Sequence, residues 1–207
     1  MNYEAKQAAI AAQAAILVAL NPKLLQVNPQ RDGLVTAAKN MRIELAAAFP
    51  GVKFSIKSRR FSGGDAIDVR WTDGPCTEQV DAIIDKYAAG SFSGMDDSYT
   101  YSSSAWNRAF GDAKYVGSDR RYSDAAVASA LRTVASKYAS NLRDAGVTLP
   151  TAAEYQSGRF SWSYAKVLGN DDARDLVSAT LYRRTWALTK QVIARWPDMA
   201  SVDEVAA

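Results

Sequence analysis

Basic side chains recur at alternate positions in one segment of the chain. Lys53, Lys57 and Arg59 fall on one face of a strand predicted over residues 52–60, because successive side chains of a strand point to opposite faces. Such a face, with an aromatic ring nearby, can follow a phosphate backbone and stack on a base, or it can contact an acidic protein surface. The alternative is a solvated sheet face, on which Lys and Arg keep an edge soluble. The candidate binding residues of this hairpin are Lys53, Lys57, Arg59, Arg60, Phe61 and Arg70.

Two further surfaces carry residue types that are common in interfaces. Arg120 and Arg121 form a second basic patch. The last predicted helix is apolar over a wide arc of its surface. Such a helix either lies at the centre of the core or uses part of its apolar surface to bind a partner. Trp, Tyr and Arg are enriched at interface hot spots. The candidate partner-contacting residues of this helix are Tyr182, Arg183, Arg184 and Trp186.

A third set of side chains is similar to the acidic and basic residues of metal-dependent nucleases. Asp68 and Arg70 are two positions apart, so a strand directs both to one face, and with Asp65 there are two carboxylates that can bind Mg²⁺. However, Asp65 lies in a predicted turn, where Asp is common, and no other acid is convincingly placed. We therefore expect no metal and no cofactor. The Gly-Gly loop at residues 62–65 is interpreted as a tight turn rather than an anion-binding nest, because it lacks the Lys-Ser/Thr ending of a P-loop.

The residues that the chain lacks narrow the function further. Its 207 residues include no His and a single Cys, Cys76, and 25 Lys and Arg against 22 Asp and Glu leave a net charge of +3. Without His there is no Ser-His-Asp triad and no His-ligated metal. A single Cys supports neither a disulfide framework nor a Cys-rich zinc site. We expect a binding protein without catalytic residues rather than an enzyme.

The secondary-structure elements that must position these side chains are predicted from the spacing of apolar residues. This spacing is helical in some segments and has a period of two in others. A helix is predicted over residues 3–20, and a second helix begins after Asp32, whose carboxylate is suited to cap it. The strands over residues 52–60 and 66–71 form an antiparallel hairpin with one apolar face. Another helix follows Pro75.

The second half of the chain is less regular at first and then helical. Residues 91–122 have a weak pattern, in which residues 97–103 and 114–116 are candidate short strands. Ser123 is suited to cap the helix that follows, and Thr151 with Glu154 fits a capping box that begins a short helix. A final long helix, capped by Asn170 or Asp171, is predicted to end near Arg195.

Two residues beside the hairpin are assigned structural roles. Trp71 continues the inward alternation of its strand and belongs to the core. Asp73 is better explained as a helix cap than as a catalytic acid.

This order of elements predicts an α+β fold. We expect a small antiparallel sheet with a central hairpin covered by helices, followed by a mainly helical C-terminal part. The expected regions are an N-terminal Ala-rich helix and connector (residues 1–30), an α+β domain (residues 31–122) and a helical C-terminal region (residues 123–207).

The only long apolar run, residues 8–20, is too short to span a bilayer as a helix. The charges of Glu4 and Lys6, which precede this run, cancel. The run therefore lacks the positively charged N-terminal region of a signal peptide. With the lone Cys, this favours a reducing cytoplasm.

Several short motifs between residues 34 and 122 occur in a fixed order. They are AAKNMRIEL (37–45), FPGVKFS (49–55), FSGGD (61–65), VRWTDGP (69–75) and GMDDSY (94–99). Together they resemble one family of large polyvalent protein-associated domains, found on conjugative plasmids, phages and related mobile elements. The resemblance implies a mobile-element protein, with counter-defence and DNA transfer as its setting, and it supplies no catalytic residues.

These observations lead to three hypotheses. The leading hypothesis is a non-enzymatic protein that counters a host defence system, such as CRISPR-Cas or restriction, by binding the defence complex and competing for its nucleic-acid contacts. The second is an accessory nucleic-acid-binding protein in plasmid DNA transfer, and the third is a metal-dependent nuclease. We expect no membrane partner, and a homodimer through the terminal helices is compatible with the pattern.

Overall fold

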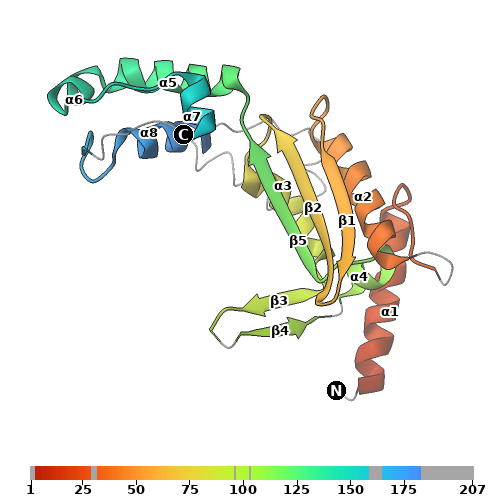
Figure 1. Cartoon of the computed structure of the whole chain (residues 1–207). Coiled ribbons are helices and arrows are strands. Elements are labelled where there is room, and N and C mark those ends of the chain that lie inside the picture. Colours follow the sequence, from red (N-terminus) through yellow and green to blue (C-terminus); the bar gives the residue numbers. More distant parts are fainter. Residues whose placement is uncertain (1–2, 29–31, 96, 103, 159–164, 183–207) are drawn as a thin grey trace.

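A three-stranded sheet forms the centre of the N-terminal part (Figure 1). The computed structural model describes residues 3–28, 32–95, 97–102, 104–158 and 165–182. The strands are β1 (Ser55–Phe61), β2 (Gly64–Thr72), β3 (Gly90–Ser93), β4 (Ser98–Tyr101) and β5 (Tyr115–Arg121). The helices are α1 (Tyr3–Leu20), α2 (Gly33–Ala48), α3 (Thr77–Ile84), the 3₁₀ helix η1 (Asp85–Tyr87), α4 (Ala105–Phe110), α5 (Asp124–Lys137), α6 (Ala139–Asp144), α7 (Ala152–Ser157) and α8 (Ala173–Tyr182).

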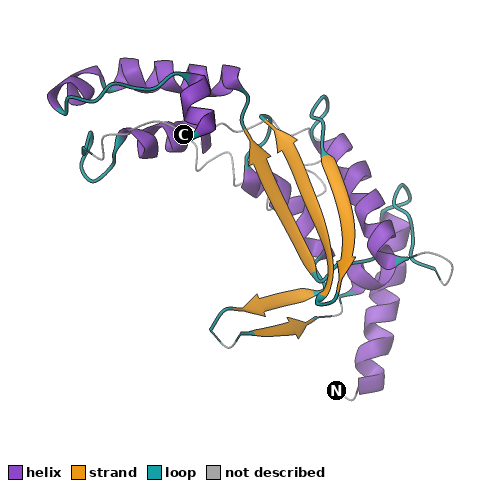
Figure 2. Ribbon diagram, viewed as in Figure 1, coloured by secondary structure: helices purple, strands orange, loops and turns teal. Residues whose placement is uncertain are grey.

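The main sheet has the order β1–β2–β5 (Figure 2). The β1–β2 hairpin is antiparallel, as expected, with Lys57 opposite Asp68. β5 pairs with β2 in parallel, with Arg70 opposite Asp119. The sheet is therefore mixed rather than purely antiparallel, because the chain crosses over through α3 and α4 before it forms β5, and a parallel pair requires such a long connection. The α+β fold class is confirmed.

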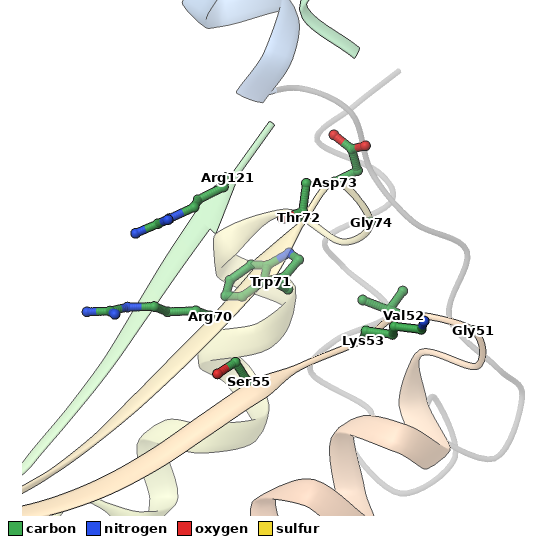
Figure 3. A pocket seen from close by; sticks show the side chains of 10 residues that line it. All are labelled: Gly51, Val52, Lys53, Ser55, Arg70, Trp71, Thr72, Asp73, Gly74 and Arg121. Atoms are coloured by element: carbon green, nitrogen blue, oxygen red, sulfur yellow. The ribbon is translucent and has the colours of Figure 1, made fainter. Parts of the chain in front are cut away.

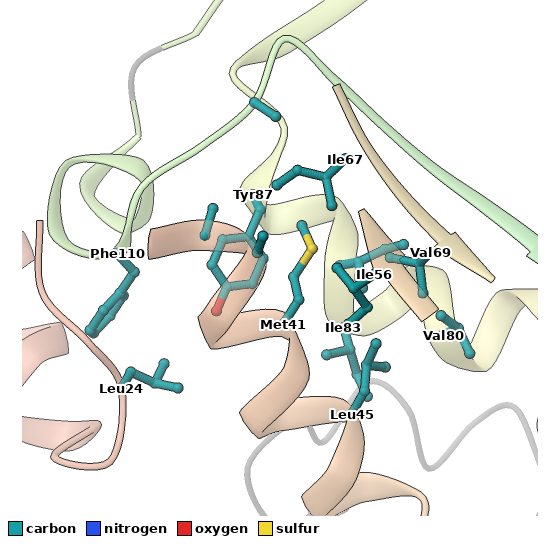
Figure 4. Packing of buried hydrophobic residues seen from close by; sticks show 14 of the residues in the cluster. Leu24, Met41, Leu45, Ile56, Ile67, Val69, Val80, Ile83, Tyr87 and Phe110 are labelled. Atoms are coloured by element: carbon teal, nitrogen blue, oxygen red, sulfur yellow. The ribbon is translucent and has the colours of Figure 1, made fainter. Parts of the chain in front are cut away.

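Helices α2 and α3 cover one face of the main sheet. Asp32 caps α2, as predicted, by accepting a hydrogen bond from the Leu34 amide at 3.0 Å. Trp71 is buried, also as predicted, and its indole N–H donates to the Pro75 carbonyl at 3.0 Å. The core between the sheet and these helices includes Met41, Leu45, Ile56, Ile67, Val69, Val80, Ile83 and Tyr87 (Figure 4).

One carboxylate is buried inside this core. Glu44 of α2 accepts hydrogen bonds from the Tyr87 hydroxyl at 2.7 Å and from the Lys86 ammonium at 2.9 Å. Buried charges require such partners, since an unpaired charge in the interior is strongly unfavourable. The cluster ties α2 to the segment that follows α3.

The second sheet consists of β3 and β4. The strand expected within residues 97–103 exists as β4, but it pairs with β3 rather than with the hairpin. The amide of Ala89 donates to the Ala113 carbonyl at 2.8 Å, next to the start of β5. This places the β3–β4 sheet beside the end of the main sheet at which β5 begins (Figure 1).

Helices α5 to α8 form a second apolar cluster beyond the other end of β5. Ser123 and Thr151 cap α5 and α7 as expected. The cap of α8 is Asp172 rather than Asn170 or Asp171, because its carboxylate accepts the amides of Arg174 and Asp175 at 2.8 and 3.0 Å. The predicted continuation of α8 toward residue 195 lies outside the described residues.

Helix α1 packs on α4, and its Ala14 joins the first apolar cluster. The N-terminal helix is therefore attached to the α+β part through Ala14 and through Ile10, Leu17 and Val18, which pack against the same cluster. Among the helices that the structure describes, none has the length and apolar character needed to cross a membrane.

Candidate functional site

The face of the main sheet opposite α2 and α3 is exposed to solvent, and no helix among the described residues covers it (Figure 1). Side chains reach it from alternate positions of all three strands. We call it the open face. It consists of Ser55, Lys57, Arg59 and Phe61 on β1, Gly64, Ala66, Asp68, Arg70 and Thr72 on β2, and Tyr115, Gly117, Asp119 and Arg121 on β5.

The open face carries more positive than negative side chains. Its cations are Lys57, Arg59, Arg70 and Arg121, and its carboxylates are Asp68 and Asp119. Arg59 pairs with Asp68 at 3.0 Å, and Asp119 lies 3.5 Å from both Arg70 and Arg121. Lys57 forms no ion pair with any described residue. Because exposed ion pairs contribute only about 0–1 kcal/mol, an anionic ligand can displace them.

Aromatic rings converge at the end of the open face where the β1–β2 turn lies. Phe61 stacks on Tyr115 with ring centroids 6.1 Å apart. Tyr99 of β4 contacts Tyr115 edge-on at 5.6 Å and Tyr101 at 4.7 Å. We call Phe61, Tyr99, Tyr101 and Tyr115 the aromatic cluster. Phe61, Tyr101 and Tyr115 are 42%, 67% and 38% exposed, so ring surface remains accessible to a ligand.

Lys114 places a positive charge over this cluster. Its ammonium lies 5.1 Å from the Tyr99 ring centroid and 5.2 Å from that of Tyr115, within the range of a cation–π interaction. The same ammonium donates to the Gly63 carbonyl at 2.8 Å. Glycine is favoured at position 64, because its φ of +138° is rarely adopted by residues with a side chain, and a Cβ there would also lie 2.6 Å from the Lys114 Cδ.

The Tyr99 hydroxyl is directed inward. It donates to the Lys114 carbonyl at 2.6 Å. Burial raises the pKa of Tyr99, and the neighbouring hydroxyls of Tyr101 and Tyr115 raise this pKa further. The ring is therefore held in one orientation as a neutral phenol.

A pocket of about 700 Å³ lies at the opposite end of the open face (Figure 3). Lys53 comes before the start of β1, yet it lines this pocket together with Arg70 and Arg121. The remaining lining residues are Gly51, Val52, Ser55, Trp71, Thr72, Asp73 and Gly74.

The structure separates two candidate arginines from the open face. Because β1 extends to Phe61, Arg60 falls on the helix side and pairs with Asp32. Arg120 also faces the helix side and donates to the Gly74 carbonyl at 2.8 Å. Arg121, its neighbour on β5, is on the open face. The expected second patch is therefore split between two faces, and Arg121 joins Arg70 instead.

The acidic residues of the nuclease hypothesis are likewise separated. Asp65 accepts the Lys114 amide at 2.7 Å, on the face opposite Asp68. Among the described residues, no group of three or more His, Cys, Asp or Glu side chains is placed to hold a metal ion. Asp73 does not cap α3, where Cys76 occupies the N-cap position. Its carboxylate instead accepts the Ser123 amide at 2.9 Å and links β2 to α5.

The sequence interpretation missed four residues of the site, Lys114 and the three tyrosines of the aromatic cluster. The tyrosines lie in the segment with the weakest periodicity, residues 91–122. The sequence pattern there did not predict which strands these tyrosines would contact. At the proposed partner helix, Tyr182 ends α8 and is exposed. Arg183, Arg184 and Trp186 lie outside the described residues.

Residues 34–123 match the sequence model of the family described as large polyvalent protein associated domain 29. This confirms the resemblance, and the match suggests a polyvalent-protein-associated domain of mobile elements. The matched segment contains all three strands of the main sheet and all four residues of the aromatic cluster. Comparisons with the curated proteins and with the solved structures found no match.

Proposed function

We propose that the chain is an accessory protein of a mobile element and that it binds single-stranded nucleic acid on its open face. The match of residues 34–123 to a polyvalent protein associated domain supports the mobile-element setting. One observation carries this proposal, namely the exposed aromatic cluster beside a row of cations, on a sheet face that none of the described helices covers. DNA transfer is a process that presents such strands.

The aromatic cluster supplies the surface on which unpaired bases stack. Phe61 and Tyr115 stack on each other, and Tyr99 connects Tyr115 to Tyr101. Stacking of a base on an aromatic side chain contributes about 1–3 kcal/mol and tolerates any base. Bases inside a duplex are already stacked on one another, so this surface favours single strands.

The cations supply contacts to the phosphates. Lys57 and Arg59 follow β1 away from the aromatic cluster, and Arg70 and Arg121 continue the row toward the pocket. With about 3.3 Å per residue, β2 is about 26 Å long. That length suits a short site, at the lower end of the range of about 4 to 16 nucleotides seen for single-strand-binding folds.

The test is a titration of a fluorescently labelled pyrimidine oligonucleotide, single-stranded and as a duplex, followed by anisotropy at several salt concentrations. We expect tighter binding of the single strand and an affinity that falls with salt. The slope of log K against log salt is about −0.7 for each phosphate neutralised. The double substitution Lys57→Ala and Arg59→Ala is therefore expected to make the slope about 1.4 less negative.

The matched control is Arg132→Ala, which removes an exposed cation from α5, far from the open face. It is expected to bind as the parent does. Absence of binding to the single strand, or an unchanged slope in the double variant, would contradict the proposal.

A second candidate function uses the same face against a protein. Asp68 and Asp119 are interleaved with the arginines, and such mixed charge supports complementary docking between proteins. The partner would be a host CRISPR or restriction complex whose nucleic-acid site the chain blocks. Capture of a stoichiometric defence subunit from a nuclease-treated host extract, lost in Arg70→Glu, would support this function over the first.

A further inference from the structure

The β3–β4 hairpin has one aromatic face and one polar face. In its register Phe92 is opposite Tyr99, and Gly90 is opposite Tyr101. Because directly opposite residues share a face and alternate residues of a strand do too, the three rings lie on one face of the hairpin. The other face carries only hydroxyl side chains, those of Ser91, Ser93, Ser98 and Thr100. No residue of either strand is charged.

The aromatic face of the hairpin adjoins the open face. Tyr99 contacts Tyr115 of β5 edge-on, with ring centroids 5.6 Å apart, and its hydroxyl donates to the Lys114 carbonyl at 2.6 Å. The backbone is joined at the same place, because Ala88 and Ala113 form a parallel bridge between the segments that lead into β3 and β5. The hairpin therefore continues the sheet surface past the start of β5 and projects from it (Figure 1).

Two rings of this face remain accessible. Phe92 is 56% exposed and Tyr101 is 67% exposed. Tyr99 adjoins both, because it is opposite Phe92 and its ring centroid lies 4.7 Å from that of Tyr101. The apolar face of an antiparallel hairpin is usually packed on a core, yet none of the described elements buries these two rings. The hairpin thus carries accessible ring surface beyond Tyr115, as far as Phe92.

The chemistry of this face suits unpaired bases. Its strands have no charge with which to bind an acidic or basic protein, and they offer ring faces, on which bases of any sequence stack. Exposed rings on a sheet typically stack two or three bases of a single strand. The continuity of this face with the cationic open face favours a nucleic acid over an apolar protein segment, because one strand then contacts both.

Charged residues at the two ends of the hairpin set the limits of this surface. At the base, the Lys114 ammonium lies 5.9 Å from the Tyr101 ring centroid. An ammonium has three donors, and the Gly63 carbonyl accepts one of them, so Lys114 can also contact a phosphate between stacked bases. In the turn beyond Phe92, the exposed carboxylate of Asp97 repels a polyanion. The surface for a strand therefore ends at Phe92.

We propose that the β3–β4 hairpin extends the single-strand site, so that bases beyond those on the open face stack on Tyr101 and Phe92. This inference rests on the proposed function, because the strand reaches the hairpin from the open face. The site then has two parts. The main sheet contributes phosphate contacts, and the hairpin contributes stacking that only a longer strand can use.

The first test compares two pyrimidine oligonucleotides, of about 5 and about 12 nucleotides, within the range of single-strand sites. Phe92→Ala is expected to weaken binding of the long one by about fivefold or more, the lower end of the contribution of one stacked base. It is expected to leave binding of the short one unchanged. The double substitution Lys57→Ala and Arg59→Ala is expected to weaken both.

Two control variants isolate the ring of Phe92. Phe92→Tyr retains a ring and is expected to bind both oligonucleotides as the parent does. Ser91→Ala changes the neighbouring residue on the polar face of the same strand, and it is also expected to leave both affinities unchanged.

A cross-linking experiment locates the bases without any substitution. Iodouracil placed at one end or the other of the long oligonucleotide forms a photochemical cross-link to an aromatic ring on which it stacks. The rings of the hairpin lie in the tryptic peptide of residues 87–108, whereas Phe61 and Tyr115 each begin another peptide. We expect the label at one end to cross-link to residues 87–108, and that end gives the polarity of the strand.

The outcomes separate the two proposals. If Phe92→Ala binds the long oligonucleotide as the parent does, or if no cross-link forms within residues 87–108, the hairpin is not part of the site and the proposed function stands. Equal weakening of both lengths by Phe92→Ala would also overturn the extension. If neither oligonucleotide binds to the parent, the proposed function fails and the extension fails with it.

Discussion

Phe61 and Tyr115 stack with their ring planes 23° apart, although β2 separates the two strands that carry them. Phe61 is opposite Gly64, and Tyr115 is opposite Ala66. Because these two β2 residues are small, the rings close over them, and Ala66 is only 3% exposed. The aromatic surface thus depends on the small size of Gly64 and Ala66 as well as on the two rings.

The first prediction concerns the aromatic cluster. Phe61→Ala and Tyr115→Ala are each expected to weaken binding of a single-stranded oligonucleotide by about 1–3 kcal/mol, because each removes a stacking surface for one base. Phe61→Tyr retains a ring and is expected to bind as the parent does. Anisotropy titration measures the change, and Tyr3→Ala on α1, which removes an exposed ring elsewhere, is the control. Full affinity in Phe61→Ala would exclude base stacking at this site.

The second prediction uses two glycines of the β3–β4 hairpin. A Cβ at Gly90 would lie 2.0 Å from the Thr100 carbonyl oxygen, whereas a Cβ at Gly94 meets nothing within 4 Å. Gly90→Ala is therefore expected to disturb the pairing that holds Tyr99 against Tyr115, and to lower affinity for single strands. Gly94→Ala is expected to leave affinity unchanged. Equal affinities of the two variants would show that β4 does not contribute to the site.

The third prediction concerns the buried carboxylate. Glu44→Ala removes the acceptor of the Lys86 ammonium and of the Tyr87 hydroxyl, and is expected to lower the free energy of unfolding by about 3–5 kcal/mol. Glu44→Gln retains an acceptor for the Tyr87 hydroxyl, so its loss is expected to be smaller. Urea denaturation followed by circular dichroism measures both. A loss below about 1 kcal/mol in Glu44→Ala would mean that the pair is not a structural support of α2.

The fourth prediction concerns pH. Burial raises the pKa of Asp112, and the charge of Asp65 raises it further. A carboxyl group whose pKa is higher in the folded state binds more protons there than in the unfolded state, so its contribution to stability falls as pH rises through that folded pKa. Asp112→Asn is therefore expected to be more stable than the parent at pH 7, and the difference is expected to shrink as the pH falls toward 3.

Thermal unfolding of the parent and of Asp112→Asn at pH 7, 5 and 3 tests this sign. Asp144→Asn changes an exposed carboxyl group at the end of α6 and serves as the comparison. A stability difference for Asp112→Asn that grows at low pH would contradict the assignment.

Local patterns in the sequence determined most of the helices and the hairpin. Asp32, Ser123 and Thr151 cap helices as predicted, because a cap depends on a side chain and on backbone amides two or three residues away. Likewise, alternation placed Lys57, Arg59 and Arg70 on one face of the hairpin. The predicted strand ends at Arg60, whereas β1 extends to Phe61. The same alternation places Arg60 on the face opposite to that of Lys57 and Arg59.

Only the tertiary structure decided where β5 and the second sheet lie. A strand's own residues specify its two faces but not its neighbour, so nothing local could show that β5 pairs with β2 in parallel. That pairing brings Tyr115 to Phe61 and Arg121 to Arg70, and the separate β3–β4 sheet brings Tyr99 to the same place. The sequence by itself determined which side chains are exposed on the hairpin. The long-range pairing of strands determined that they form one surface with an aromatic end and a cationic pocket.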